Sequence, residues 1–508
     1  MNKKTDISLD ATATQGVGLA VIRQLFGRLH AADLRYCHPK SNEHVDASMQ
    51  GFSDLDVLVQ AGRSDDLQRI LADTGFRRFQ ATALTAYPAV EDYLALDDAT
   101  GRIVHLHLHH RLTVGQMYLK GYRLPWEREL ISTRQLDPEN GLYVAMPEME
   151  LLLLLVRDAL KRRLRTTVSE WLGRQPKKGD FAREFAWLTA RTDHDAVAAL
   201  AGRLIGTKAE APMRRLLQSS ASSQDRRAFA ALVRPMLKYH RSYGTVSAAL
   251  LLPVREVFWL FGGLSRRRFH WAFPLRRISP RGGMVVAFIG SDGAGKSTLC
   301  ADTVAWLGGK LDVVPIYFGS GDGPSSFLRM PLQFVRRLVD RRAASGSPGA
   351  RRSGWRGWLR AVALIPWALS LSLEKRGKLR RMIRARNRGM MVVCDRYAQD
   401  QVQGFNDGRL LDRLAHSPWR FARALAAWEA RPYHDAQLDP PDVVIKLVAS
   451  PSVALSRRPE MRAEEIELRI AAVRSLRFPD QTLVAEIDAD RPFEEVSRSV
   501  RRVVWKVL

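Results

Sequence analysis

The sequence predicts an α/β fold for its C-terminal part, in which a parallel sheet carries helices on both faces. Two observations support this prediction. Short apolar runs alternate with helical segments, as in strands joined by crossover helices. A glycine-rich loop also lies between the first apolar run and a helix over 297–307. The expected strands are 284–289, 313–317, 390–394, 443–448 and 483–487.

The length of 508 residues indicates two or three domains. We expect an α+β domain over 1–145, a helical connector over 146–280 and the parallel-sheet domain over 281–508. Helical periodicity predicts the connector. Its expected helices are 147–165, 180–191, 194–204, 226–239 and 245–264.

Charge and cysteine content narrow the class of protein. The net charge of +26 favours anionic partners, namely nucleotides, nucleic acid or acidic lipid. The three cysteines, Cys37, Cys300 and Cys394, show no paired spacing, which argues against a disulfide framework or a cysteine zinc site. The first residues lead into no apolar signal core, so we expect a cytoplasmic protein.

Much of the positive charge lies in one segment. Residues 329–388 contain 17 Lys and Arg against two acids, a net charge of +15. The segment is a solvated helical face or a surface for an anionic membrane, which would make the protein peripheral to the membrane. Sequence-specific nucleic-acid binding is not expected, because no helix-turn-helix, zinc or RNA-binding signature accompanies the charge. The sequence does not decide whether the chain forms a homodimer.

Two apolar stretches, 248–264 and 358–373, are interrupted by charged residues or proline and fall short of the roughly 20 apolar residues that span a bilayer. We therefore expect both to form buried helices. A helix at the membrane interface, with Trp355, Trp358 and Trp367 beside arginines, is the alternative.

The glycine-rich loop fits G-x-x-x-x-G-K-[ST], a phosphate-binding loop (P-loop). Its glycines let backbone N–H groups face phosphate oxygens, and the following helix directs its positive end at the anion. Lys296 would reach the β- and γ-phosphates of ATP, and the Ser297 hydroxyl would bind Mg²⁺. The loop residues are Gly290, Ser291, Asp292, Gly293, Ala294, Gly295, Lys296, Ser297 and Thr298.

A second signal is an apolar strand that ends in Asp395 and Arg396. Ligands of parallel sheets gather at the carboxyl ends of strands, so both residues are expected near the P-loop. Asp395 could bind Mg²⁺ or orient an acceptor, and Arg396 could hold an acceptor phosphate. A helix cap followed by a surface arginine is the plain alternative.

The P-loop followed by Asp395-Arg396-Tyr397 resembles the thymidylate kinase family of P-loop nucleotide kinases. The stretches 441–447, 450–458 and 487–496 resemble later parts of that family, so the resemblance covers about 284–508. It implies transfer of the ATP γ-phosphate to a nucleoside monophosphate such as dTMP, with Asp292 facing the acceptor sugar. Family members with glycine at the position of Gly293 supply catalytic arginines from a lid. The candidates here are Arg457, Arg458 and Arg462.

One departure from the family concerns the acceptor. The family carries a Thr-Arg-Glu-Pro stretch after its second strand, whereas this chain has 316–323, without the arginine or the glutamate. A sugar or glycan precursor is therefore a rival acceptor. A non-catalytic ATP-dependent switch at an anionic membrane is the rival outside enzymes.

In the N-terminal part, Asp54 and Asp56 stand at i and i+2 on an expected strand, which places both carboxylates on one face. Two such carboxylates can bind Mg²⁺ for nucleotidyl transfer. The pattern resembles the Asp-x-Asp strand of nucleotidyltransferase-fold proteins, with Ser41 near the position of that family's Gly-Ser. An acidic pair without a metal is the alternative.

Strand alternation also places His105, His107 and His109 on one face, where the resemblance would supply a third carboxylate. Zinc binding by this histidine trio is disfavoured, because three residues along one strand diverge from tetrahedral geometry. A polar strand face beside Asp54 and Asp56 is the favoured interpretation.

Overall fold

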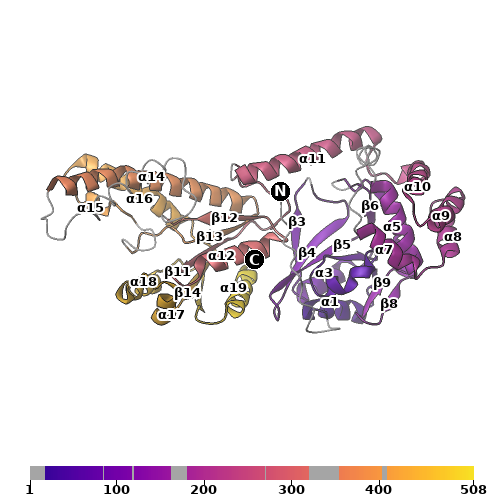
Figure 1. Cartoon of the computed structure of the whole chain (residues 1–508), viewed down its shortest axis with the longest axis horizontal. Helices are drawn as coiled ribbons and strands as arrows, with labels where there is room; N and C mark the ends of the chain where they lie inside the picture. The colour runs from indigo at the N-terminus through magenta and orange to yellow at the C-terminus, as the bar shows by residue number, and fades with distance from the viewer. Residues whose placement is uncertain are drawn as a thin grey trace. The chain divides into compact units, whose positions relative to one another are not determined.

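The computed structural model describes residues 18–508 except 84, 117–118, 162–179, 269–270, 320–353 and 403–408 (Figure 1). The chain forms two compact units, Met1–Leu260 and Phe261–Leu508. The stretch 345–354 is rich in Gly, Ser and Arg, and its composition predicts a mobile loop. Its residues 345–353 lie outside the described residues, as does the first part of the basic segment, 329–353.

The second unit is built on a parallel sheet with the strand order β12-β13-β11-β14-β15. Three of these strands are buried along their whole length, or nearly so, as expected when helices cover both faces of a sheet. The predicted α/β fold is confirmed, with each strand within one residue of its expected ends. The strands are β11 (Val285–Gly290), β12 (Val313–Tyr317), β13 (Met391–Asp395), β14 (Val443–Val448) and β15 (Leu483–Asp488).

Helices lie against both sides of this sheet, with α14 and α16 on one side and α12 and α19 on the other (Figure 1). The P-loop joins β11 to α12 at the central strand, where chain connections leave in opposite directions and ligands of such sheets bind. The helices are α12 (Lys296–Gly308), α14 (Gly354–Asn387), α15 (Asp412–Ala415), α16 (Arg420–Leu438), α17 (Pro451–Arg457), α18 (Ala463–Ser475) and α19 (Phe493–Val507).

The first unit contains a mixed sheet in which β1, β2, β5, β4 and β3 are neighbours in that order. Strands β2 and β5 are parallel, and the other pairs are antiparallel. Helices α1 and α3 contribute apolar residues to the core on one face. The elements are α1 (Ala20–Ala31), β1 (Tyr36–Cys37), α2 (Val45–Met49), β2 (Leu55–Val59), α3 (Ser64–Asp73), β3 (Arg77–Ala81), β4 (Val90–Asp97) and β5 (Arg102–His109).

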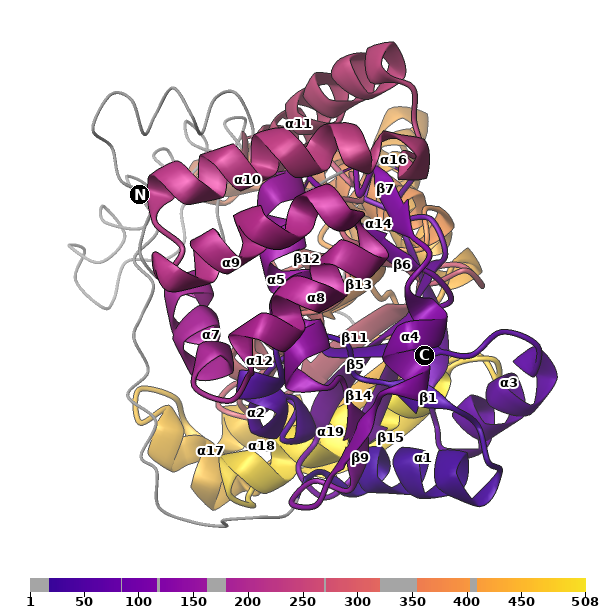
Figure 2. The same cartoon turned by 90° about the vertical axis from the view of Figure 1, so that its right-hand side faces the viewer.

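A group of helices packs around a second apolar core of the same unit, and Figure 2 shows these helices side by side. The leucine-rich helix α5 is its centre, buried on nearly all sides. The preceding elements are β6 (Leu112–Val114), β7 (Tyr122–Leu124), α4 (Glu127–Ser132), β8 (Gln135–Asp137) and β9 (Leu142–Val144). The helices are α5 (Pro147–Lys161), α7 (Asp180–Thr189), α8 (His194–Leu204), α9 (Glu210–Gln218) and α10 (Ser223–Met236).

Helix α11 (Thr245–Arg268) contains the apolar stretch 248–264 and corrects one expectation. Only 6% of its most apolar 18-residue window is buried, so the prediction of a buried helix is wrong. The reason is that its apolar residues occur on all sides of the helix, more than the neighbouring elements cover. The other apolar stretch lies in α14, where Trp367, Ala368 and Leu371 are buried as expected. The side chains of Trp355 and Trp358 lie outside the described residues.

Candidate functional site

The P-loop owes its shape to two glycines in the left-handed region, Gly293 (φ +82°) and Gly295 (φ +84°). A Cβ atom at Gly293 would stand 2.8 Å from the carbonyl oxygen of Ala454 in α17. No side chain fits there without moving α17, so this loop cannot carry the arginine that some thymidylate kinases have at that position. A cation for the phosphates must come from elsewhere in the unit.

Lys296 begins α12 and points back along the P-loop. Its side chain is buried, and Nζ donates a 2.7 Å hydrogen bond to the carbonyl oxygen of Ser291. Burial and the neighbouring guanidinium of Arg396 together lower the pKa of Lys296 to about 8, against the pull of Asp292. A phosphate anion in the loop would favour the charged ammonium.

Ser297 and Asp395 meet because β11 and β13 are adjacent, with Phe288 opposite Asp395 in the register. The Ser297 hydroxyl donates a 2.7 Å hydrogen bond to Asp395 Oδ2. The other carboxylate oxygen, Oδ1, is buried and accepts no hydrogen bond from a described residue. A buried carboxylate oxygen beside a serine hydroxyl is a donor set that suits Mg²⁺.

Asp292, inside the P-loop, gathers cations from three elements. Arg396 Nη2 donates to Asp292 Oδ1 at 3.1 Å, Lys296 Nζ lies 3.7 Å from the same oxygen, and Arg469 of α18 donates to Oδ2. Burial alone would raise the pKa of Asp292, but these three cations lower it below its ordinary value. Arg396 also has a left-handed backbone (φ +68°), a conformation rare for a side-chain-bearing residue.

Arg469 is a functional candidate that the sequence analysis missed. Glu465 accepts a 2.7 Å hydrogen bond from its Nη2 atom and directs the guanidinium at the P-loop. The available signal was the Glu465/Arg469 pair at i and i+4, which places both side chains on one face of α18. The sequence offers no means of telling which face of α18 meets the loop.

The arginines expected from the lid are placed differently from one another. Arg457 Nη1 donates to the Gly293 carbonyl at 3.1 Å, and its Nη2 donates to the Ala489 carbonyl at 3.1 Å, so Arg457 ties α17 to the P-loop backbone. Arg458 is exposed and pairs with Glu460 at 3.2 Å. Arg462 is exposed at the N-terminus of α18. The structure brings Arg457 to the loop. Arg458 is exposed, but its charge contributes to the lowered pKa of Asp292, and Arg462 is exposed.

Much of the acceptor side, including 320–323 of the divergent stretch 316–323, lies outside the described residues. Tyr397, next to Arg396, donates a 2.6 Å hydrogen bond to the Asp439 carbonyl and packs edge-on against Phe318. It supports the sheet, and it also lines a small pocket together with Gly290, Lys296 and Arg396.

Comparisons with known proteins agree with this geometry. No protein-family model matches the chain. The chain is 28% identical over 223 residues to the uncharacterized ATP-binding protein YghR of Escherichia coli (strain K12), which is 43% of this chain and 86% of that protein. It is 26% identical over 231 residues to the uncharacterized ATP-binding protein YghS of the same strain, 44% of this chain and 93% of that protein.

A third relative names an activity. The thymidylate kinase of Symbiobacterium thermophilum is 28% identical over 206 residues, 37% of this chain and 90% of that enzyme. The chain is similar to ATP-binding, nucleotide-kinase-like proteins. Neither the acceptor nor the role of the first unit follows from these relatives.

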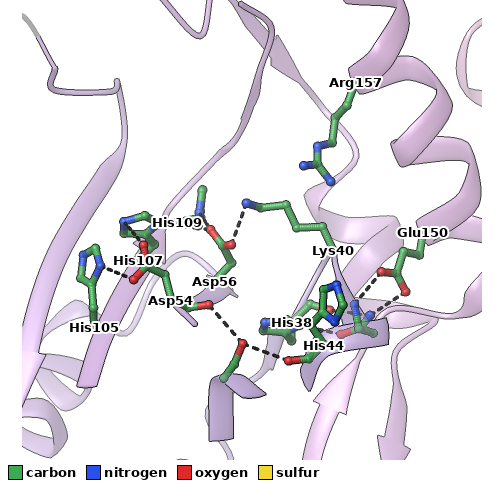
Figure 3. Close-up of polar contacts among 12 residues, drawn as sticks. His38, Lys40, His44, Asp54, Asp56, His105, His107, His109, Glu150 and Arg157 are labelled. Carbon is green, nitrogen blue, oxygen red and sulfur yellow. Dashed lines mark hydrogen bonds and ion pairs between the residues drawn. The ribbon is translucent and has the colours of Figure 1, made fainter. Parts of the chain in front are cut away.

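The first unit holds a second polar cluster, produced by strand register (Figure 3). Asp56 of β2 is opposite His107 of β5, and His107 is opposite Asp92 of β4, so the three residues form one row across the sheet. Asp54 directly precedes β2. It lies beside His105, which is two residues before His107 on the same face of β5. His105 Nδ1 is 2.9 Å from Asp54 Oδ1, and His105 Nε2 is 2.8 Å from Asp92 Oδ1.

Asp56 is already paired with a cation. Lys40 Nζ lies 2.6 Å from Asp56 Oδ2, and His109 Nε2 lies 2.9 Å from Asp56 Oδ1. Burial would raise the pKa of Asp56, but Lys40 and the histidine hydrogen bonds hold it well below its ordinary value. Ser41, the residue after Lys40, has a left-handed backbone (φ +61°).

The histidine trio does not act as one set, because each pair of histidines faces a different aspartate. The structure groups Asp54 with His105 and His107, and Asp56 with His107 and His109. Burial lowers the pKa of His109. For His107, burial opposes protonation, but hydrogen bonds to Asp56 and Asp92 raise its pKa overall.

Cationic side chains border the same cluster. Burial lowers the pKa of Lys120 to about 7, helped by Lys40, Arg157 and Lys161. Burial also lowers the pKa of Lys161 to about 8, helped by Arg157 and Lys40. Neighbouring cations lower one another's pKa because their positive charges repel. An anion bound among them would relieve this repulsion and would be stabilised.

Proposed function

We propose that the chain is an ATP-dependent phosphotransferase resembling thymidylate kinase, which moves the ATP γ-phosphate to a small-molecule acceptor. A nucleoside monophosphate such as dTMP is the first candidate, and a sugar or glycan precursor is the second. The observation that carries the proposal is the convergence of Lys296, Arg396 and Arg469 on Asp292 in a P-loop. Three cations around one carboxylate leave a positive site for a larger anion.

Mg²⁺ fits the pair formed by Ser297 and Asp395, since Asp395 Oδ1 is buried and accepts no hydrogen bond from a described residue. When bound there, the ion would neutralise charge on the phosphates. The chain's own residues orient and bind: the backbone N–H groups of the P-loop hold the phosphates, and Lys296 supplies a buried ammonium.

Arg396 and Arg469 are then the cations closest to the transferred phosphoryl group. In the structure they contact Asp292, so this carboxylate holds their positions until a phosphate replaces it. Arg469 comes from α18, in the place where the family resemblance puts a lid. Fixed cations aimed at developing charge lower the barrier to phosphoryl transfer because no solvent has to reorganise.

The test is an acceptor screen with γ-labelled ATP and the full chain, including dTMP and a panel of sugars. We expect the label to move to one acceptor and Asp395→Asn to lower turnover while ATP still binds. ATP binding without transfer to any acceptor would contradict the phosphotransferase and favour a non-catalytic switch.

A second proposal concerns location. We propose that α11 attaches the protein to an anionic membrane. Among the described residues, α11 is the one helix long and apolar enough to cross a membrane, with a mean hydropathy of 1.4 over its most apolar 18 residues. Six of its exposed apolar side chains recur at helical spacing. The sequence adds Arg267 and Arg268 at its C-terminal end, beside Arg266, which pairs with Asp312 at 2.6 Å. Such a helix binds a bilayer through apolar burial and through attraction to acidic lipid. The recurring residues are Val246, Leu250, Val254, Val257, Phe261 and Leu264.

Flotation with anionic vesicles tests this second proposal. We expect the full chain to float with vesicles and Leu250→Glu/Leu264→Glu to remain in the soluble fraction. Leu468→Glu, at an exposed leucine of α18, is the matched control and should float. Self-association of the chain through α11 without vesicle binding would contradict the proposal and indicate a homodimer.

A further inference from the structure

The Asp54/His105/His107 cluster has the donor arrangement of a metal centre. We propose that the first unit binds one divalent transition metal ion, such as Zn²⁺, through Asp54, His105 and His107. Their ligand atoms all lie within 4.8 Å of one another. Zinc sits about 2.0–2.2 Å from imidazole nitrogen and carboxylate oxygen, so donors that share an ion are about 3–3.5 Å apart. The 2.9 Å between His105 Nδ1 and Asp54 Oδ1 is close to this spacing.

Both histidines contact Asp54 through one ring nitrogen, and each also contacts a second carboxylate. His105 Nε2 is 2.8 Å from Asp92 Oδ1, while its Nδ1 faces Asp54. His107 Nδ1 is 3.4 Å from Asp56 Oδ1, while its Nε2 lies 3.2 Å from Asp92 Oδ1 and 3.9 Å from Asp54 Oδ2. A carboxylate on the outer nitrogen fixes the ring and its tautomer, as is typical of metal-bound histidine. Asp92 and Asp56 are therefore positioning residues.

The donor set separates this site from a two-aspartate magnesium site. Magnesium prefers oxygen ligands, whereas imidazole suits Zn²⁺ and its neighbours in the first transition row. Asp56 is also occupied, since Lys40 binds one of its oxygens at 2.6 Å and His109 the other at 2.9 Å. Asp54 and Asp56 therefore have different roles, although they share a strand face.

Accessibility favours the Asp54 group over the alternative group of Asp56, His107 and His109. The side chain of Asp54 is 38% exposed and that of His107 is 22% exposed, which gives an ion a path to the site. Asp56 is 12% exposed and paired with Lys40. Three protein ligands at an accessible site leave a coordination position open, as in catalytic zinc sites. This inference does not rest on the phosphotransferase activity of the second unit.

The test is metal titration of the full chain after chelator treatment, without nucleotide, using a chromophoric zinc chelator as competitor. We expect one tightly bound Zn²⁺ per chain. Asp54→Asn and His107→Gln should each weaken binding by at least about 100-fold, and Asp92→Asn by about 10–100-fold because it acts through His105. Bound Co²⁺ should give a visible absorption spectrum that both ligand variants lose.

Two variants serve as controls. His110→Gln removes a neighbouring histidine that faces Glu91, and it should bind Zn²⁺ like the wild type. His109→Gln decides between the two groups and should also retain binding. His105 is fully buried, so its replacement could unfold the protein, and the test uses Asp54 instead, whose side chain is 38% exposed. Circular dichroism checks that each variant folds. No tight Zn²⁺ binding, unchanged binding in Asp54→Asn and His107→Gln, or loss only in His109→Gln would each overturn the proposal.

Discussion

Both units place aspartates at the strands of a sheet, but the partners of those aspartates differ between the units. In the second unit, Asp395 keeps one buried oxygen without a hydrogen bond, and Asp292 is surrounded by cations. In the first unit, Asp56 is paired with Lys40 and His109, and Asp54 faces two histidines. The second unit therefore has positive charge available for an anion, and the Asp54 cluster has nitrogen and oxygen donors available for a cation.

The difference follows from where the cations come from. In the second unit they come from separate elements, the P-loop, the end of β13 and α18, so a phosphate can draw them from Asp292. In the first unit the histidines are fixed by strand register, and only small adjustments are open to them. Strand register thus fixes a small set of ligands, and separate elements allow a site to close around a substrate.

The largest expected effect is at Lys296. Lys296→Ala removes the buried ammonium from the P-loop, and phosphotransfer should fall by at least about 1,000-fold, since one preorganised donor alone contributes about 100- to 1,000-fold. Turnover of γ-labelled ATP measures it. The control is Lys506→Ala in α19, an exposed lysine that should leave activity unchanged. Full activity in Lys296→Ala would remove the P-loop from the reaction.

Arg469 sharpens the comparison, because it is the cation that comes from α18, outside the P-loop and β13. Arg469→Ala should lower kcat by about 100-fold, in line with loss of one charge-stabilising donor, while ATP binding changes little. Steady-state kinetics and ATP titration separate the two effects. Arg474→Ala, in the last turn of the same helix, is the matched control. Equal effects of both substitutions would mean that α18 contributes only structure.

Glu150 reports on the buried charge network of the first unit. Burial, helped by the charge of Glu184, raises its pKa to about 7, although the hydrogen bonds that it accepts from the Asn42 backbone and side chain lower the pKa. The folded state therefore binds the proton more tightly than the unfolded state, and stability falls as pH rises from about 4.5 to about 7. A shift of this size corresponds to about 3 kcal/mol at most.

Melting curves of the full chain and of Glu150→Gln test this linkage. The neutral variant lacks the titration, so its melting temperature relative to the wild type should rise between pH 5 and pH 8. Other groups titrate in both proteins and cancel in the difference. A difference that stays constant with pH would show that Glu150 does not carry the effect.

The smallest predicted effect is at Gly293. Gly293→Ala places a side chain at φ +82° and against the carbonyl of Ala454, at a cost of about 1–2 kcal/mol for the backbone conformation alone. ATP affinity should fall by about tenfold as the loop or α17 shifts, measured by calorimetry. Gly308→Ala, where an added Cβ meets nothing within 4 Å, is the control. Equal affinity in both variants would show that the loop tolerates a side chain.

The sequence predicted the parts of the molecule that depend on local pattern. The strands of the second unit follow from apolar runs, and the meeting of Asp395 with the P-loop follows from the parallel arrangement. Three features depend on tertiary packing and could not be predicted. To predict the role of Arg469, one must know how α18 is oriented, and to predict that of Asp92, one must know the register of β4 on β5. The exposure of α11 depends on which elements pack beside it.

The fate of each phosphate of ATP tests the central claim most directly. The full chain is supplied with α- or γ-labelled ATP and the acceptor panel, alongside the Lys296→Ala and Asp54→Ala variants. Our account predicts that the γ-label moves to an acceptor and ADP accumulates, that Lys296→Ala abolishes the transfer, and that Asp54→Ala retains it. Pyrophosphate release that persists in Lys296→Ala and is lost in Asp54→Ala would contradict it and place nucleotidyl transfer in the first unit.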